Sequence, residues 1–534
     1  MSLLNRGFAL AIALLAVPRP AAPDHSITLV VLIAVDQMRG DYLARYADQW
    51  TGGFARLRAQ GIVFANGREY HATTETAPGH STMLSGREPA HTEIVSNVEA
   101  VQDPDAPVIG VPTGPGASPR RFRGTTLVDW MLARDPGTRV LSVSRKSDAA
   151  ILPIGRAKAG VYWFENGNFT TSHYYADILP GWVQAFNARK GAAALTATSW
   201  ELLLADSAYR EPDSEPFENS GSNFTFPHPL PSTADSTNKE IGSFPWMDSL
   251  TLAFALEGAS TLQLGQRNGP DLLSISLSTT DIVGHAYGPD SREIHDQLLR
   301  LDRYLGWFLD SLARLVPASR IVLAFTGDHG VTSLPEYTVL VRHQPGGRIW
   351  LGGLATAMER QLSERYHVDF GLAFHSGLVS ADVASLKARR VNVDSLAAAL
   401  AAEVQLLPGI ARVYTPATLA AAPPTDESAR LWRRLLPATY GWLVCALPKP
   451  GYVWSPGGLR AEHGGAHAED INVPVVFLVP GATPEHPARP VNTVDIAPTL
   501  AALLGVKPTE PVDGVVLPEV VAPHPAIAGR RAGQ

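Results

Sequence analysis

The chain has 534 residues, of which 45% are hydrophobic, so it can bury a large core as one domain with insertions or as two to three domains. The formal net charge of −7 and the pI of about 6.1 reveal no excess of Lys and Arg. We therefore expect no nucleic-acid polymer as a partner, whereas a small anionic substrate is compatible with this composition.

Residues 1–23 have the layout of a secretory signal peptide. A single basic residue, Arg6, precedes the apolar run FALAIALLAV, and the small and proline-rich PRPAAP follows it. This run is too short to span a bilayer stably, and no later stretch approaches about 18 uninterrupted apolar residues. We expect an exported protein, periplasmic or extracellular, without a transmembrane segment in the mature chain. A retained N-terminal anchor is the alternative.

Five apolar runs rich in β-branched residues indicate buried parallel strands, and four of them lead directly into polar segments. Ligands bind outside the carboxyl ends of the strands in open α/β sheets, so Asp36, Lys146, Asp281 and Asp328 should meet in one crevice. We predict an α/β fold with a central, mostly parallel sheet sandwiched by helices. The five runs are 27–35, 139–144, 272–277, 320–326 and 473–479.

Thr76 is the candidate nucleophile. Ala77-Pro78 predicts a helix start immediately after it, which would place Thr76 at the positive end of the helix dipole. A threonine hydroxyl needs a metal or a base to become a nucleophile at neutral pH. The alternative role for a threonine in this position is a simple helix N-cap.

Two segments look like insertions into a core made of residues 24–156, 236–334 and 455–525. Residues 157–235 are aromatic and rich in Asn, Ser and Pro, and residues 335–454 contain alanine-rich helical stretches and a proline-rich break. We expect both to form a cap around the crevice. Between them, residues 291–316 predict a long amphipathic helix, with a capping box from Asp290 to Glu293 at its start.

The acidic and imidazole side chains form two groups, and each group has enough residues to bind one metal ion. Asp281 and His285 lie four residues apart and would share one face of a helical turn, whereas Asp328 and His329 are adjacent before a glycine. The alternatives are a capping aspartate, a hydrogen-bonded histidine or a loop histidine. Cys445 is the only cysteine, so no disulfide forms within the chain and zinc must be held by oxygen and nitrogen. The groups are Asp281, His285 and His463 for one zinc ion, and Asp36, Asp328, His329 and Thr76 for the other.

Two metals about 4 Å apart can stabilise both the entering and the leaving oxygen of an in-line displacement at phosphorus. Phosphoryl transfer is therefore the expected reaction class. The sequence also resembles the alkaline phosphatase superfamily, in particular its bacterial branch of zinc-dependent threonine-nucleophile phosphatases, with nucleotide pyrophosphatase/phosphodiesterases as next of kin. The resemblance extends from residue 27 to about 515 and rests on a T-x-P-x-H element, TAPGH at 76–80, on SGREPAH after it, and on the late VNTVDIAPTLAALLG.

This resemblance implies two zinc ions, a covalent phosphothreonine at Thr76, a small phosphate-ester substrate, and phosphate contacts from Asn97 and Lys146. The second cation of the family's K-x-R element is absent, because Asp148 occupies that position. Arg145 or Arg156 could supply the charge instead. Since a dianionic monoester gains most from two cations, this departure weakens a pure phosphomonoesterase assignment.

We therefore expect a phosphomonoesterase, with a phosphodiesterase or nucleotide pyrophosphatase on the same scaffold as the alternative. Four aromatic residues support the alternative if they stack on a nucleotide or aryl group, but they could equally be core of the cap. A metal-binding pseudoenzyme is less favoured, because Thr76 and the other ligand positions are intact. The aromatic residues are Tyr162, Trp163, Phe164 and Phe169.

Overall fold

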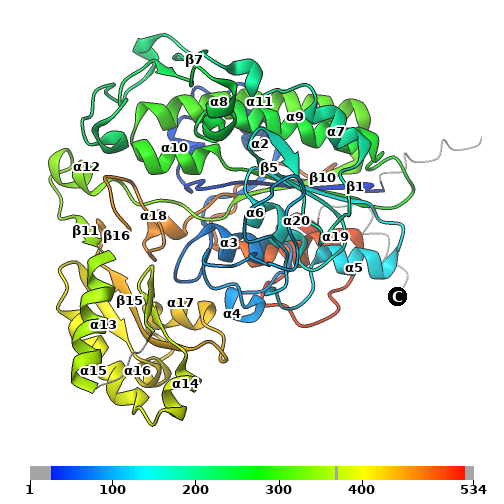
Figure 1. The fold of residues 1–534 in the computed structure, drawn as a ribbon. Helices are drawn as coiled ribbons and strands as arrows, with labels where there is room; N and C mark the ends of the chain where they lie inside the picture. Colours follow the sequence, from blue (N-terminus) through cyan, green and yellow to red (C-terminus); the bar gives the residue numbers. More distant parts are fainter. Residues whose placement is uncertain (1–25, 351, 367–370, 523–534) are drawn as a thin grey trace, which may run out of the picture.

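The computed structural model describes residues 26–350, 352–366 and 371–522 (Figure 1). The expected signal peptide, residues 1–23, lies outside the described residues. Among the helices of the described ranges, none is both long and apolar enough to cross a membrane.

An eight-stranded sheet forms the centre of the larger part of the molecule, in the order β2-β17-β10-β1-β9-β4-β5-β6. The five strands from β10 to β5 are parallel, whereas β17, β2 and β6 pair in the antiparallel sense. The expected α/β class with a mostly parallel sheet is confirmed. The bounds are β1 Leu29–Val35, β2 Ile62–Phe64, β4 Val140–Ser144, β5 Gly160–Glu165, β6 Asn168–Thr170, β9 Asp271–Leu277, β10 Ile321–Gly327 and β17 Val475–Leu478.

The expectation that 473–479 is a parallel strand is wrong. β17 pairs with β10 in the antiparallel sense, with Leu323 opposite Leu478. The segment before β17 contains His463 and lies at the carboxyl edge of the parallel strands, so the chain enters β17 from that edge and must run back. An apolar run predicts a buried strand but carries no information about its direction.

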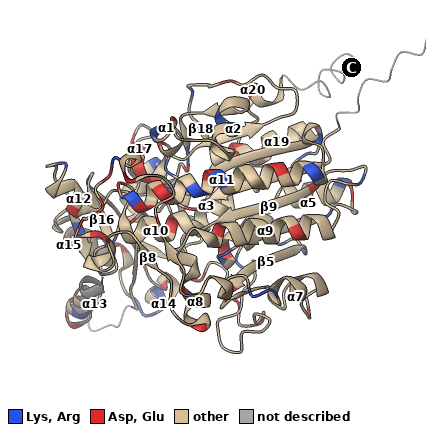
Figure 2. Ribbon diagram, turned by 90° about the horizontal axis from the view of Figure 1, so that it is seen from above, with Lys and Arg blue, Asp and Glu red and all other residues tan. Residues whose placement is uncertain are grey.

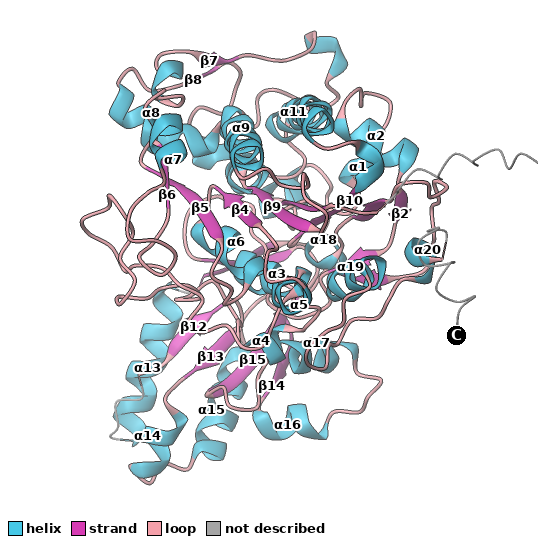
Figure 3. Cartoon of the chain, turned by 90° about the vertical axis from the view of Figure 1, so that its right-hand side faces the viewer, coloured by secondary structure: helices cyan, strands magenta, loops and turns pink. Residues whose placement is uncertain are grey.

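Helices cover both faces of the sheet, and β1 shows how the sequence arranges this. Its alternate residues face opposite sides: Leu29, Val31, Ile33 and Val35 join one hydrophobic cluster, and Val30, Leu32 and Ala34 join the other. In Figures 1 and 3, one face carries α2, α9 and α11, and the other carries α3, α5 and α19. These helices are α2 Gly53–Gln60, α3 Thr76–Met83, α5 Leu127–Arg134, α9 Trp246–Thr261, α11 Arg292–Leu315 and α19 Ile496–Leu504.

The long helix α11 begins one residue later than a capping box at Asp290 would require. Its N-cap is Ser291, whose side chain accepts a hydrogen bond from the backbone N–H of Ile294. The carboxylate of Asp290 instead accepts hydrogen bonds from Ser333 and Arg342. Tertiary partners therefore override the local capping pattern.

Residues 335–454 contain a separate four-stranded sheet, in the order β12-β13-β15-β14, with its own hydrophobic cluster. Figure 1 shows this sheet and its helices as a distinct lobe at the lower left. Cys445 is buried in β15, as expected for a core residue. The elements are β12 Ala373–His375, β13 Leu378–Ser380, β14 Ile410–Tyr414, β15 Trp442–Pro448, α13 Gly352–Tyr366, α14 Val383–Ala388, α15 Val393–Gln405, α16 Pro416–Ala421 and α17 Glu427–Leu435.

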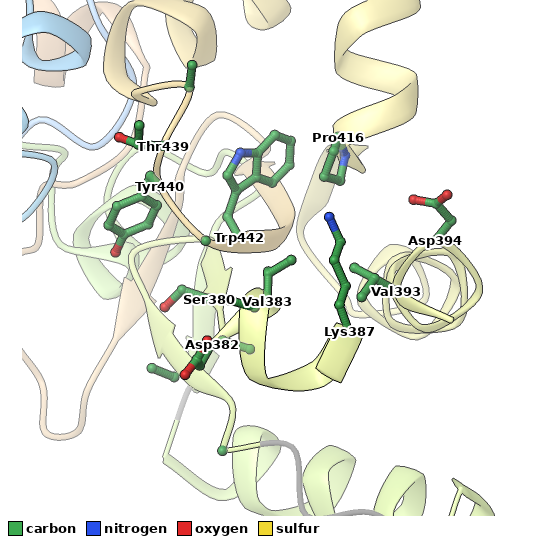
Figure 4. Close-up of a pocket in the computed structure, with 16 residues that line it drawn as sticks. Ser380, Asp382, Val383, Lys387, Val393, Asp394, Pro416, Thr439, Tyr440 and Trp442 are labelled. Carbon is green, nitrogen blue, oxygen red and sulfur yellow. The ribbon is translucent and has the colours of Figure 1, made fainter. Parts of the chain in front are cut away.

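A cavity of about 850 Å³ in this lobe lies between α14, α15 and the end of the loop before β15 (Figure 4). Lys387, Asp394, Tyr440 and Trp442 are among its lining residues, whereas none of the candidate catalytic or metal-binding residues lines it. The candidate catalytic and metal-binding residues lie instead at the edge of the central sheet.

Residues 157–235 differ from a simple cap, because their first strands, β5 and β6, extend the central sheet. Further along, Trp200 packs over α11 and donates a 2.6 Å hydrogen bond from its indole N–H to Asp296. The elements of this segment and the remaining ones are β3 Gly67–Arg68, β7 Ser199–Trp200, β8 His228–Pro229, β11 Gly347–Trp350, β16 Tyr452–Ser455, β18 Val491–Asn492, α1 Tyr42–Arg45, α4 Pro89–Thr92, α6 Ser147–Ile151, α7 Gly181–Asn187, α8 Ala234–Glu240, α10 Thr279–Tyr287, α12 Pro335–Leu340, α18 Ala468–Ile471 and α20 Pro518–Val521.

Along the ribbon in Figure 2, Lys and Arg positions are interspersed with Asp and Glu positions rather than gathered by sign. This distribution agrees with the slightly acidic composition.

Candidate active site

The polar segments expected to converge do meet at the carboxyl edge of the parallel strands. Asp36 directly follows β1, Asp328 directly follows β10, and Lys146 comes two residues after β4. Asp281 lies in the first turn of α10, which follows β9. Because these strands are neighbours in the sheet, residues hundreds of positions apart lie within contact distance.

Asp281, His285 and His463 form the first candidate metal centre. The Nε2 atoms of His285 and His463 lie 3.2 and 3.7 Å from Oδ1 of Asp281, and 3.1 Å from each other. The i, i+4 spacing of Asp281 and His285 on α10 brings both to one face, as their spacing predicts. Three donor atoms thus point at one position.

Asp36, Asp328 and His329 form the second candidate metal centre, and all three are completely buried. Nε2 of His329 lies 3.5 Å from Oδ1 of Asp36 and 3.6 Å from Oδ2 of Asp328. None of these three atoms has a hydrogen-bond partner. Buried polar atoms without partners are costly, and a bound cation would satisfy all three at once.

The three histidines are oriented in the same way. Nδ1 of each ring lies beside a backbone carbonyl, that of Ala461 for His285, Thr74 for His463 and Gly330 for His329, at 2.6 to 2.9 Å. A Nδ1–H donor to a carbonyl fixes the tautomer and leaves the Nε2 lone pair free for a metal. The donor sets of both centres, nitrogen and carboxylate oxygen, therefore fit a metal such as zinc.

Lys146 lies between the two centres. Its Nζ is 2.6 Å from Oδ2 of Asp36 and 2.6 Å from Oδ2 of Asp281, so it touches one carboxylate of each group. Burial opposes the charge on Lys146, but Asp281 and Asp36 outweigh it and raise the pKa of the ammonium. Burial raises the pKa of Asp36, and the carboxylates of Asp281 and Asp328 raise it further. The site is thus a strongly negative pocket that favours cations.

Thr76 is the first residue of α3 and is buried. Its Oγ1 accepts a hydrogen bond of 3.3 Å from Nζ of Lys146. The N-cap position of α3 belongs to Glu75, so the alternative of Thr76 as an ordinary N-cap does not hold. The hydroxyl lies at the positive end of the helix, next to the only lysine among the converging residues.

A cavity of about 370 Å³ adjoins Lys146 and is lined by Asn97, Asp148, Arg145 and Phe164. Arg145 rather than Arg156 therefore lies near the candidate phosphate position: Arg156 is exposed and is not among the lining residues. Asp148 lines this cavity beside Lys146, and its carboxylate contributes to the raised pKa of the Lys146 ammonium.

The aromatic residues are divided by the structure. Trp163 and Phe169 are 0% and 1% exposed, and Tyr162 packs edge-on against Trp182 and Phe254. These three are core, so the stacking role proposed for them is wrong. Phe164 alone of the four lines the cavity beside Lys146.

Sequence reasoning missed Gln37. Its backbone N–H donates to Oδ1 of Asp328 at 3.0 Å, and its side-chain amide donates to Oδ1 of Asp281 at 2.8 Å, so it links the two centres. Gln37 has a φ of +63°, which no local pattern signals. Gly284 permits this arrangement, because an added Cβ would lie 1.8 Å from Oε1 of Gln37.

Two candidate metal centres lie at the carboxyl edge of a parallel sheet, and Lys146, which contacts a carboxylate of each, donates to the buried hydroxyl of Thr76. This arrangement defines the class: a hydrolase with two candidate metal sites. Comparisons with known proteins are specific about the family. The family model for type I phosphodiesterases and nucleotide pyrophosphatases matches residues 30–347. The chain is 29% identical to alkaline phosphatase PhoV of Synechococcus elongatus, covering 92% of each chain, and 30% identical to alkaline phosphatase PhoK of a Sphingomonas species, covering 94% of this chain and 93% of the relative.

The crystal structure of alkaline phosphatase PafA superposes with a TM-score of 0.85 at 27% identity, covering 94% of this chain and 100% of that chain. The protein belongs to the type I phosphodiesterase/nucleotide pyrophosphatase family of the alkaline phosphatase superfamily, on the branch of the bacterial alkaline phosphatases. The expected family and the expected hydrolysis of phosphate esters are confirmed. The identity of the metal and the roles of individual side chains stay predictions.

Proposed function

We propose that this protein is an exported alkaline phosphatase that uses two zinc ions to hydrolyse small phosphomonoesters through a covalent phosphothreonine at Thr76. The observation that carries the proposal is the position of Thr76. Its hydroxyl lies at the N-terminus of α3, 3.3 Å from the ammonium of Lys146, which itself contacts one carboxylate of each candidate metal centre. Export rests on the sequence of residues 1–23.

The side chains of both centres suit zinc, since each supplies three nitrogen or oxygen donors and leaves a further position open. Zinc bound there would supply Lewis acidity for the attacking and the leaving oxygen. Thr76, whose hydroxyl accepts a hydrogen bond from Lys146, would be a fourth, exchangeable donor to the centre of Asp36, Asp328 and His329.

The side chains of the protein bind the phosphoryl group and supply the nucleophile. Lys146, released from Asp36 and Asp281 when these carboxylates hold a metal, can donate to a phosphoryl oxygen, and the amide of Asn97 can donate to another. Oγ1 of Thr76 loses its proton to solvent and forms a bond to phosphorus while the bond to the ester oxygen breaks, and the alcohol leaves with a proton from solvent. Water attacks the phosphothreonine, releases inorganic phosphate and restores the hydroxyl.

A phosphodiesterase is the second candidate, and one observation favours it. Asp148 lines the cavity beside Lys146, where a second cation would favour the dianion of a monoester. Phe164, which lines the same cavity, offers an apolar face to the second ester group of a diester.

The test compares kcat/KM for an aryl phosphomonoester with that for the matched aryl phosphodiester, using zinc-loaded enzyme. The proposal requires the monoester to be preferred. Thr76→Ala should lose nearly all hydrolysis while keeping its metal, and Thr76→Ser should keep substantial activity. A phosphate ester trapped at acidic pH should map to the peptide that contains Thr76. A trapped ester on any other peptide would refute the nucleophile assignment.

A further inference from the structure

Glu75, the residue before Thr76, is a buried carboxylate that the mechanism above does not use. It is 3% exposed, and its side chain does not cap α3, although Glu75 occupies the N-cap position. Oε2 accepts a 2.8 Å hydrogen bond from the backbone N–H of Asn97. Burial opposes its charge, but the partners of Oε1 and Oε2 outweigh it and keep the pKa of Glu75 below its usual range. A buried carboxylate so fully bonded holds its neighbours in fixed positions.

Asn97 is thereby held from both sides of Thr76. Glu75 binds its backbone N–H, and the backbone N–H of Ala77 donates a 2.7 Å hydrogen bond to its side-chain carbonyl oxygen. This second bond caps α3 and uses the carbonyl oxygen of the side chain. The amide nitrogen of Asn97 is left to donate to a phosphoryl oxygen, and its position is set by the two residues that flank the nucleophile.

The other carboxylate oxygen of Glu75 contacts the lobe formed by residues 335–454, the smaller lobe. Oε1 accepts a 2.5 Å hydrogen bond from the hydroxyl of Ser376 and lies 2.7 Å from Nε2 of His375. His375 is the last residue of β12, and Ser376 begins the tight turn to β13, in which Ser376 and Gly377 have positive φ values. This turn of the smaller lobe thus contacts the N-terminus of α3, the helix that begins with Thr76, although about 300 residues separate the two in the sequence.

The same turn also contacts the loop of His463. An added Cβ on Gly464 would lie 2.9 Å from the hydroxyl of Ser376, and Gly464 itself has a φ of +86°. The backbone N–H of Gly464 donates to the carbonyl of Thr74, which also accepts from the ring of His463. The turn is therefore packed between the nucleophile segment and a metal-ligand loop and is not a loose edge of the lobe.

We propose that Glu75 is a positioning residue, through which the His375–Ser376 turn of the smaller lobe fixes Asn97 for phosphate binding. The smaller lobe then stabilises the position of an active-site residue, in addition to lying beside the site. This inference rests on the proposed function, since it assigns Asn97 to the phosphate. It predicts that the position of Asn97 depends on Glu75, and that the position of Glu75 depends in turn on His375.

The test is a double-mutant cycle on zinc-loaded enzyme with an aryl phosphomonoester. Glu75→Ala should lower kcat/KM by about tenfold or more, the range of a lost buried, charge-assisted hydrogen bond. Glu75→Gln, which retains an acceptor for Asn97, should recover part of this loss. In an Asn97→Ala background, Glu75→Ala should have little further effect, because its target is gone. The inhibition constant for inorganic phosphate should rise in step with the loss.

His375→Ala should show a smaller loss that disappears in the Glu75→Ala background. Since His375 is 38% exposed, Glu75→Ala leaves its ring in contact with solvent. Metal content and melting temperature are measured for every variant. Glu403→Gln, on the exposed side of α15 in the same lobe, is the matched control and should behave as wild type. Additive losses in the Asn97→Ala background, or a Glu75→Ala enzyme whose phosphate inhibition constant is unchanged, would overturn the inference. A wild type without phosphomonoesterase activity would instead contradict the proposed function, not this relationship.

Discussion

The side-chain amide of Gln37 donates a 2.8 Å hydrogen bond to Oδ1 of Asp281, although Gln37 directly follows Asp36, which belongs to the other candidate metal centre. Its backbone N–H holds Asp328 at the same time. One residue thus orients a carboxylate in each centre, which ties the geometry of the two sites together.

We expect Gln37→Leu to weaken metal binding at both centres by about 10- to 100-fold, the usual effect of losing a residue that orients a ligand. The metal affinity of each centre is measured by titrating metal into the apo-protein in a calorimeter. Gln49→Leu is the control, because the amide of Gln49 binds the carbonyl of Ala208, away from the site. A variant that loses affinity at only one centre would show that the two are independent.

Chelation should abolish turnover, and zinc should restore it. Asp281→Ala and Asp328→Ala should each lose metal as well as rate, because each removes one of three donors of a centre. Elemental analysis of fully active enzyme should give two transition-metal ions per chain. One ion or fewer in such a sample would contradict the two-zinc site, and a variant that keeps both ions and near-normal activity would contradict its ligand.

Lys146→Ala should slow monoester hydrolysis more than diester hydrolysis, because the monoester carries the additional negative charge. Asp148→Arg should shift the preference further toward monoesters, by about one to three kcal/mol in relative kcat/KM. Lys239→Ala, an exposed lysine on α8, serves as the control. If the ratio of the two kcat/KM values is unchanged in both test variants, neither side chain faces the phosphate and the diesterase becomes the better assignment.

Burial raises the pKa of Asp248 to about 6. Its carboxylate accepts hydrogen bonds from the backbone N–H of Thr279 and the side-chain amide of Gln297. The folded protein then keeps a proton that the unfolded chain releases near pH 4, so stability should fall as the pH rises from about 4 to 6, by about 3 kcal/mol. Asp248→Asn resembles the protonated form, and the unpartnered Oε1 of Gln297 can accept from the new amide.

Thermal melts should therefore show Asp248→Asn to be more stable than wild type at pH 8, with the difference vanishing near pH 4. Asp235→Asn, the same change at an exposed position of α8, should not alter the pH dependence. A difference between Asp248→Asn and wild type that is constant over this pH range would mean that the carboxylate does not titrate there.

Much of the site could be predicted because it follows from one rule, that polar residues after parallel strands meet at one edge. Asp36, Lys146 and Asp328 obey it directly. Strand direction could not be predicted for β17, since an apolar run looks the same in either sense. The burial of Tyr162 and Trp163 was equally invisible, because aromatic residues suit both a core and a binding surface. Gln37 and Glu75 depend on long-range hydrogen bonds and a positive φ, for which the local sequence gives no signal.

The position of β1 in the middle of the sheet has a consequence for folding. Its Leu29 pairs with Asp271 of β9 and Ile321 of β10, both far downstream. Until those segments have been synthesised, the first strand has no neighbours, and closing such long loops makes folding slow. A chain that completes its central pairing late stays unfolded for longer, which is the state that the proposed export would require during passage across a membrane.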